Sequence, residues 1–280
     1  MQAWHFPRLP DWLIYSAVVC ALLTAALSRR EHADAPEAPP PPGPNDGALL
    51  APASPFDRTL NMKGAPPRRA AGTAFSVSDR GVWVTARHVV EGCARPALMV
   101  GPGQGVAARA RLDPDSDVAI LSTEGGAPGL PLGLDQPLHI GERGFHPGFP
   151  QGRPGEAASR LLGRQTIIAA GRGKNGGAVQ PVIAWAQGGR TEGLRGGLAG
   201  LSGAPVLDSA GRVVGVTIAE APRRGRIYTA APESLRKALA DVKPGPTAGP
   251  LGDPVTVENY GRVADSLRRE LSVVQVACLA

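Results

Sequence analysis

Residues 71–86 read AGTAFSVSDRGVWVTA and hold two short apolar runs on either side of a polar turn. Apolar runs of this length, bounded by turn residues, predict β-strands. Similar runs recur along the chain at spacings of about 8 to 12 residues, which is typical of an all-β sandwich or barrel. The expected strands cover 71–77, 81–86, 97–100, 106–112, 118–122, 161–170, 179–186, 204–207 and 212–219.

The composition agrees with a turn-rich β protein. The 37 glycines and 29 prolines make 66 of 280 residues. Each costs about 1 to 3 kcal/mol inside a helix, so a long helical bundle is excluded. With 42% hydrophobic residues and a net charge of +6, the chain is also not expected to be disordered. The clearest helical pattern of the core covers 232–241, where Pro and Glu stand at the start.

Charge and cysteine usage argue against two classes of function. The basic residues are spread along the chain without a dense run or interleaved aromatic residues, so no nucleic-acid partner is expected. The three cysteines include no CxxC motif, and the histidines have no ligand spacing. The sequence therefore predicts no metal site and no cofactor.

An apolar segment near the N-terminus predicts contact with a membrane. Residues 12–27 carry no charge, and as a helix they would extend about 24 Å, slightly short of the roughly 30 Å hydrocarbon core. We expect residues 1–30 to form a single-pass anchor in a bacterial inner membrane, with the remainder in the periplasm. A cleaved signal sequence followed by secretion, or a buried helix, remains the alternative. Residues 31–67 then form a linker rich in Pro, Ala and Gly.

Three residues of the core suggest nucleophilic chemistry. Ser202 lies between two glycines in AGLSGAPV (199–206), a setting that exposes the hydroxyl and lets backbone N–H groups approach a substrate carbonyl. His88 follows the strand expected at 81–86, and Asp117 precedes the strand expected at 118–122. Each residue alone is usually structural. Together, the order His, Asp, Ser in an all-β chain is one of the known orders of a catalytic triad.

The segments GTAF, VTARHVV, DSDVAIL and GLSGAPVLDSAGRVVGV resemble the chymotrypsin-fold, trypsin-like serine peptidases, nearest to the bacterial HtrA/Deg-like branch. The resemblance covers about residues 68–240 and implies two six-stranded antiparallel β-barrels in a domain at 68–241. It implies that Ser202 is the nucleophile, His88 the general base and acid, and Asp117 the group that orients His88. The N–H groups of Gly200 and Ser202 would form the oxyanion hole.

Departures from the family pattern bear on activation and specificity. Leu201 stands where the family usually has Asp or Asn, so activation through a new N-terminus is not expected. The 39 residues from 242 to 280 are too few for a PDZ domain. The resemblance places uncharged residues in the P1 pocket, which favours small to medium apolar side chains: Gly196, Thr217, Ile218 and Ala219.

The C-terminal residues, 242–280, read as a Pro/Gly linker followed by a short tail. Within the tail, 258–270 has an amphipathic helical pattern and 271–279 reads as a strand. Cys93 and Cys278 are hypothesised to form a disulfide in an oxidising compartment, which would tie the tail to the first barrel. Two buried free thiols are the alternative.

The sequence thus predicts a serine endopeptidase that cleaves protein or peptide substrates through an acyl-enzyme, in the periplasm or outside the cell. The alternative function is a non-catalytic peptide-binding or scaffold module on a peptidase fold. An intact set of His88, Asp117 and Ser202 favours the enzyme.

Overall fold

The computed structural model describes residues 10–28, 47–62, 71–169, 178–242 and 252–279. Most of the two predicted linkers, 31–67 and the start of 242–280, lies outside these ranges. The chain divides into two compact units, Met1–Ala33 and Asp34–Ala280. The first contains helix α1 (Asp11–Ser28). In the described parts of the chain, no helix combines the length and the apolar character needed to cross a bilayer, so the anchor predicted for residues 12–27 is not confirmed.

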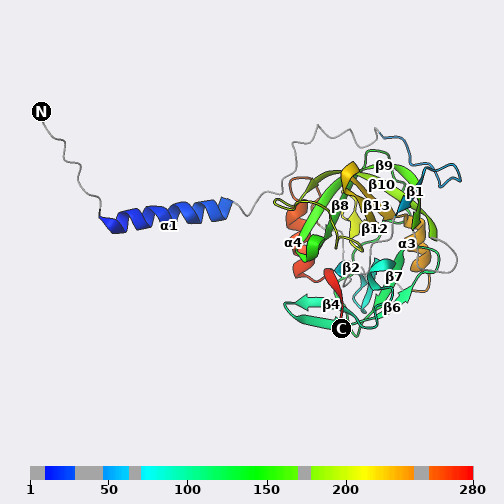
Figure 1. Cartoon of the computed structure of the whole chain (residues 1–280), viewed down its shortest axis with the longest axis horizontal. Helices are drawn as coiled ribbons and strands as arrows, with labels where there is room; N and C mark the ends of the chain where they lie inside the picture. Colours follow the sequence, from blue (N-terminus) through cyan, green and yellow to red (C-terminus); the bar gives the residue numbers. More distant parts are fainter. Residues whose placement is uncertain (1–9, 29–46, 63–70, 170–177, 243–251, 280) are drawn as a thin grey trace, which may run out of the picture. The chain divides into compact units, whose positions relative to one another are not determined.

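The second unit contains two sheets, one of which closes into a six-stranded antiparallel barrel (Figure 1). The strand order is β8-β9-β10-β13-β12-β11, and β8 closes the barrel because it pairs with both β9 and β11. Strand β1 (Thr59–Met62) lies parallel to β9 as an addition at the edge. The barrel strands are β8 (Arg143–Gly148), β9 (Gly155–Ala169), β10 (Ala178–Arg190), β11 (Pro205–Leu207), β12 (Val213–Ala221) and β13 (Arg226–Ala230).

The other sheet has seven strands in the order β5-β4-β14-β2-β3-β7-β6 and forms a half-barrel. One of its inner strands, β14, comes from the C-terminal part of the chain, whereas the others come from the first half of the core. Its strands are β2 (Ala71–Ser78), β3 (Val82–Ala86), β4 (Pro96–Gly101), β5 (Gln104–Ala107), β6 (Arg109–Leu112), β7 (Val118–Ser122) and β14 (Val273–Cys278).

The prediction that the second sheet also closes into a barrel is therefore wrong. The run expected as one strand over 106–112 is interrupted at Ala108, whose N–H donates to Pro96 O at 2.9 Å. Within the described ranges, β5 pairs with β4 and β6 pairs with β7, at opposite edges of the sheet. The two edges are thus consecutive pieces of one bent segment, and in the described parts of the chain no strand pairing joins β5 to β6.

Aliphatic side chains fill most of the two cores, as expected from a chain with only 4% aromatic residues. The barrel interior packs around Trp185, whose Nε1–H donates to Thr229 Oγ1 at 3.0 Å. Fully burying one Val or Leu side chain contributes about 1.5 to 3 kcal/mol. The expected helix at 232–241 is α3 (Pro232–Ala238), which buries Leu235.

The C-terminal tail packs against both sheets. Helix α4 (Tyr260–Arg269) lies against β8 and β9, and the Tyr260 ring is 5.7 Å from that of Phe145. On the same helix, Arg268 pairs with Glu156 at 2.9 Å, and the two side chains are only 9% and 6% exposed. Strand β14 then inserts between β2 and β4, antiparallel to both. The tail therefore joins the barrel to the half-barrel.

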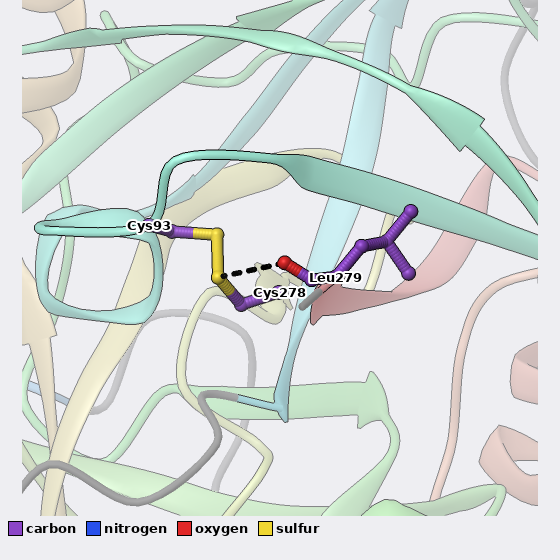
Figure 2. Close-up of a disulfide and its surroundings, with 3 residues drawn as sticks. All are labelled: Cys93, Cys278 and Leu279. Atoms are coloured by element: carbon purple, nitrogen blue, oxygen red, sulfur yellow. Dashed lines mark hydrogen bonds between the residues drawn. A yellow bond between two sulfur atoms is a disulfide. The ribbon is translucent and has the colours of Figure 1, made fainter.

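A disulfide fixes the end of this tail (Figure 2). Cys93, just after helix α2 (Arg87–Val90), is bonded to Cys278 at the end of β14, with 5.7 Å between the Cα atoms. The next residue, Leu279, donates its N–H to Arg95 O at 3.0 Å. This is the cysteine pair that the sequence suggested, and it ties the tail to the half-barrel that contains His88.

Candidate active site

The pairing of two strands brings His88 and Asp117 together. Strands β3 and β7 are antiparallel with Ala86 opposite Val118, so the residues that follow one strand meet those that precede the other. The Asp117 carboxylate accepts the His88 backbone N–H at 2.9 Å through Oδ1 and contacts His88 Nδ1 at 2.7 Å through Oδ2. An ionised Asp117 holds the proton on Nδ1, which leaves the lone pair on His88 Nε2.

Asp117 is also held from the opposite half of the molecule. Its backbone N–H donates at 2.7 Å to Oε1 of Gln180, a residue of β10 that is only 3% exposed. Gln180 was not predicted as a site residue, although an amide inside the apolar run 179–186 indicates a buried polar contact. This hydrogen bond joins the half-barrel that contains His88 to the closed barrel.

The Ser202 turn is wedged between the two sheets. The Ser202 carbonyl accepts the N–H of Thr73 on β2 at 2.8 Å, and the N–H of Gly203 donates to Thr217 O on β12 at 2.7 Å. Gly203 has φ +88°, and a Cβ there would lie 2.0 Å from Thr73 O and 2.4 Å from Thr85 Oγ1, so glycine is required. The turn is thus pressed against strand β3 three residues before His88.

Two backbone N–H groups beside Ser202 are available to a ligand. Among the residues that the structure describes, the N–H groups of Gly200 and Ser202 have no acceptor. The intervening Leu201 donates to Leu198 O at 2.8 Å, and its side chain is buried in the barrel core. Leu201 therefore anchors the turn by apolar packing, at the position where the resemblance led us to expect Asp or Asn. In the same set of residues, no hydrogen bond joins Ser202 Oγ to His88.

The sequence of the chain matches the model of a known protein family, which identifies its fold. The model for the trypsin-like peptidase domain matches residues 72–216, which is more than half of the chain. The chain belongs to the trypsin-like peptidase family. No curated protein matches the sequence of this trypsin-like peptidase.

Solved structures share the fold of this trypsin-like peptidase at low sequence identity. The Rv3671c protease from M. tuberculosis in its active form has a TM-score of 0.50 and 18% identity, over 72% of this chain and 97% of that one. The HtrA-type protease AlgW with a decapeptide has a TM-score of 0.46 and 16% identity, over 72% of each chain. The MamO protease domain from Magnetospirillum magneticum has a TM-score of 0.47 and 17% identity, over 62% of this chain and 97% of that one.

The residues expected in the P1 pocket of the trypsin-like peptidase lie on two elements. Thr217, Ile218 and Ala219 are on β12, and Gly196 is in the loop before Ser202, where its carbonyl accepts Arg190 Nη1 at 2.7 Å. Thr217 Oγ1 bonds to Nδ1 of the buried His146 at 2.9 Å, so this hydroxyl points into the barrel. Among the described residues, Thr217 Oγ1 and Gly196 have different hydrogen-bond partners and none in common.

One acidic side chain lies close to this part of the peptidase and was missed. Both carboxylate oxygens of Glu220, on β12, lie 2.7 Å from the N–H of Leu198, which donates to them. Burial raises the pKa of Glu220, while the Leu198 N–H and the charge of Arg190 oppose that rise. Glu220 follows directly after the predicted pocket residue Ala219, but its contact to Leu198 depends on the folded loop.

His88 and His146 differ in the direction in which their pKa values are shifted. Burial acts to lower the pKa of His88, but the charge and hydrogen bond of Asp117 and the charge of Glu91 raise it above 6.5. By contrast, burial lowers the pKa of His146 to about 3, so this ring is neutral. Its Nε2 contacts Ser159 Oγ at 2.7 Å, and the ring serves the packing of the barrel. Within the described ranges, no group of three or more His, Cys, Asp or Glu residues could hold a metal ion.

Proposed function

We propose that this trypsin-like peptidase is a serine endopeptidase with Ser202, His88 and Asp117 as its triad. The observation that carries the proposal is the Asp117–His88 pair, held at 2.7 Å beside a glycine-flanked Ser202 turn. The unpaired N–H groups of Gly200 and Ser202 supply the second part of the machinery, because an acyl-transfer site needs donors for the developing oxyanion.

In the proposed mechanism, His88 Nε2 accepts the Ser202 Oγ proton as Oγ attacks the peptide carbonyl carbon. The carbonyl oxygen becomes an anion that the N–H groups of Gly200 and Ser202 stabilise. His88 then gives its proton to the leaving amine, the C–N bond breaks, and the acyl group stays on Ser202. A water molecule repeats the sequence, releases the acid, and restores Ser202 Oγ–H. Asp117 stays ionised and stabilises the imidazolium form of His88.

A fluorophosphonate probe tests this function directly. We expect the probe to label wild-type protein at one site, and to fail on Ser202→Ala, because only an activated serine reacts at a useful rate. His88→Ala should also abolish rapid labelling while the fold, followed by circular dichroism, is retained. A folded wild-type protein that resists labelling would support the alternative, a non-catalytic peptide-binding or scaffold module.

The raised pKa of His88 predicts a characteristic pH profile. Because the base must be unprotonated, kcat/KM is expected to rise with pH through an apparent pKa above 6.5 and then level off. The measurement is kcat/KM on a peptide substrate from pH 5 to pH 9, with folding checked at each pH. An acid limb centred at or below pH 6.5 would contradict the proposed pairing with Asp117.

We propose peptides with small to medium apolar P1 side chains as substrates. The support is the uncharged set of Gly196, Thr217, Ile218 and Ala219 expected at the pocket. Cleavage of a peptide library, with Ser202→Ala as the control, tests the preference. A dominant Lys or Arg at P1 would contradict it and would point to Glu220.

We further propose that the peptidase unit acts outside the cytoplasm. The Cys93–Cys278 disulfide supports this, because such bonds persist in oxidising compartments. Attachment through residues 12–27 stays a prediction, as does the alternative of a cleaved signal. Cell fractionation, with accessibility of the peptidase unit to external protease in spheroplasts, tests both points, and a protected cytoplasmic domain would contradict export.

A further inference from the structure

The loop that carries the proposed oxyanion hole needs an anchor, because Leu201 offers no charged group to hold it. We propose that Gln151 is a positioning residue that fixes this loop and keeps the Gly200 N–H available to the substrate. The inference rests on the proposed peptidase function. It concerns residues 195–200, which the sequence marks as rich in glycine and which the structure docks on the turn Pro150–Gly152.

The side chain of Gln151 holds two carbonyl groups of the loop. Its Nε2 donates to Arg195 O at 2.6 Å and to Gly197 O at 2.8 Å. Both partners are acceptors, so only the NH2 end of the amide can occupy this position. One side chain thereby holds two residues that follow it in the sequence by 44 and 46 positions.

The backbone of Gln151 sets the direction of the next peptide. Its N–H donates to Ala199 O at 2.5 Å. The C=O of Ala199 and the N–H of Gly200 belong to one trans peptide unit, and in such a unit these two groups point in opposite directions. The bond from Gln151 therefore turns the Gly200 N–H away from the Pro150–Gly152 turn, and a rotated peptide would lose this bond.

The backbone geometry shows that the turn at Gln151 and the loop at Gly200 are in close contact. Gln151 has φ +55°, a conformation that residues other than glycine seldom adopt. Gly200 has φ +99°, and a Cβ there would lie 2.5 Å from Phe149 O and 3.3 Å from Gln151 N, so the two segments touch through their backbones. Thr73 Oγ1 adds a third restraint because it donates to Gly200 O at 2.8 Å and accepts the Phe149 N–H at 3.1 Å.

Replacing Gln151 with Gly separates positioning from stability. Glycine accepts a positive φ without strain and keeps the backbone N–H, but it removes the amide from the loop. We expect an unchanged or higher thermal midpoint, a kcat lowered on the order of 10- to 100-fold, and a KM within about threefold of wild type. This range lies below the roughly 10² to 10³-fold cost of removing an oxyanion donor outright. The rate of fluorophosphonate labelling should fall by a similar factor.

The kcat of Gln151→Glu should depend on pH in a way that a purely structural role of Gln151 would not produce. An ionised carboxylate facing two carbonyl groups repels them, whereas its protonated form can donate one hydrogen bond. The ratio of variant kcat to wild-type kcat should therefore increase as the pH is lowered. Arg153→Ala, a change to an exposed residue two positions away, serves as the matched control and should retain wild-type kinetics.

The outcomes distinguish this inference from the function on which it rests. If the wild type is labelled and Gln151→Gly matches its labelling rate and kcat, the positioning role of Gln151 is wrong. If the kcat loss of Gln151→Gly is accompanied by an equivalent loss of folded protein, the role is structural and the inference fails. If the folded wild type is not labelled at all, the proposed function fails, and this inference fails with it.

Discussion

Replacing Asp117 with Asn is expected to lower kcat by about four orders of magnitude while the fold is retained. The Asp117 carboxylate accepts both the His88 N–H and the Nδ1 proton, through separate oxygens. An asparagine has one acceptor oxygen, and its NH2 group would face Nδ1 and favour the tautomer with the proton on Nε2. In that tautomer His88 cannot accept the proton of Ser202.

The measurement is kcat on a peptide substrate, with thermal unfolding as the test of folding. Asp115→Asn is a matched control because it makes the same chemical change in the same turn, at an exposed residue whose partner is Lys237. We expect the control to retain activity within a small factor. Equal losses in the two variants would mean that Asp117 does not orient His88.

Ending the chain at residue 251 is expected to prevent the domain from folding. The deletion removes β14, so β2 and β4 lose their shared neighbour, and it removes Arg268 from the buried carboxylate of Glu156. Breaking one buried pair in this way costs about 3 to 5 kcal/mol. Folded domains retain only about 5 to 15 kcal/mol of stability, so the added loss of a central strand exceeds what the fold can tolerate.

Guanidinium unfolding followed by circular dichroism checks this expectation, and we predict that the truncated chain shows no cooperative transition. The double variant Cys93→Ser/Cys278→Ser keeps strand β14 and serves as the control. It should still unfold cooperatively, with stability lowered by about 2 to 5 kcal/mol. A truncated chain that unfolds cooperatively and reacts with a fluorophosphonate would show that the tail is dispensable.

The strands that sequence predicts well are those whose apolar pattern is continuous. Residues 118–122 match β7, and 71–77 differs from β2 by one residue, because both runs are buried along almost their whole length. Strand β8 was not predicted, because RGFHPG contains two glycines, a proline and a histidine, all of them turn-like or polar. Its burial depends on the closed barrel, which is a property of the tertiary structure.

The residues of the candidate site also fall into two groups, those that the sequence predicts and those that it does not. His88, Asp117 and Ser202 stand in recognisable local motifs, so sequence resemblance singles them out. Gln151 and Gln180 stand in no motif, and each meets its partner only because distant strands fold against each other. The open edge between β5 and β6 likewise depends on one backbone interruption, at Ala108, which the residue types on either side do not indicate.

The position of β14 also constrains the order in which the protein can be made. During synthesis, the other six strands of the half-barrel are made long before residues 273–278 are added to the chain. Until then β2 and β4 each have an open edge, and such edges are where nascent chains pair wrongly or aggregate. The half-barrel that contains His88 is thus complete only after residues 273–278 have been made. Such an arrangement would keep a partly made peptidase from cutting its neighbours.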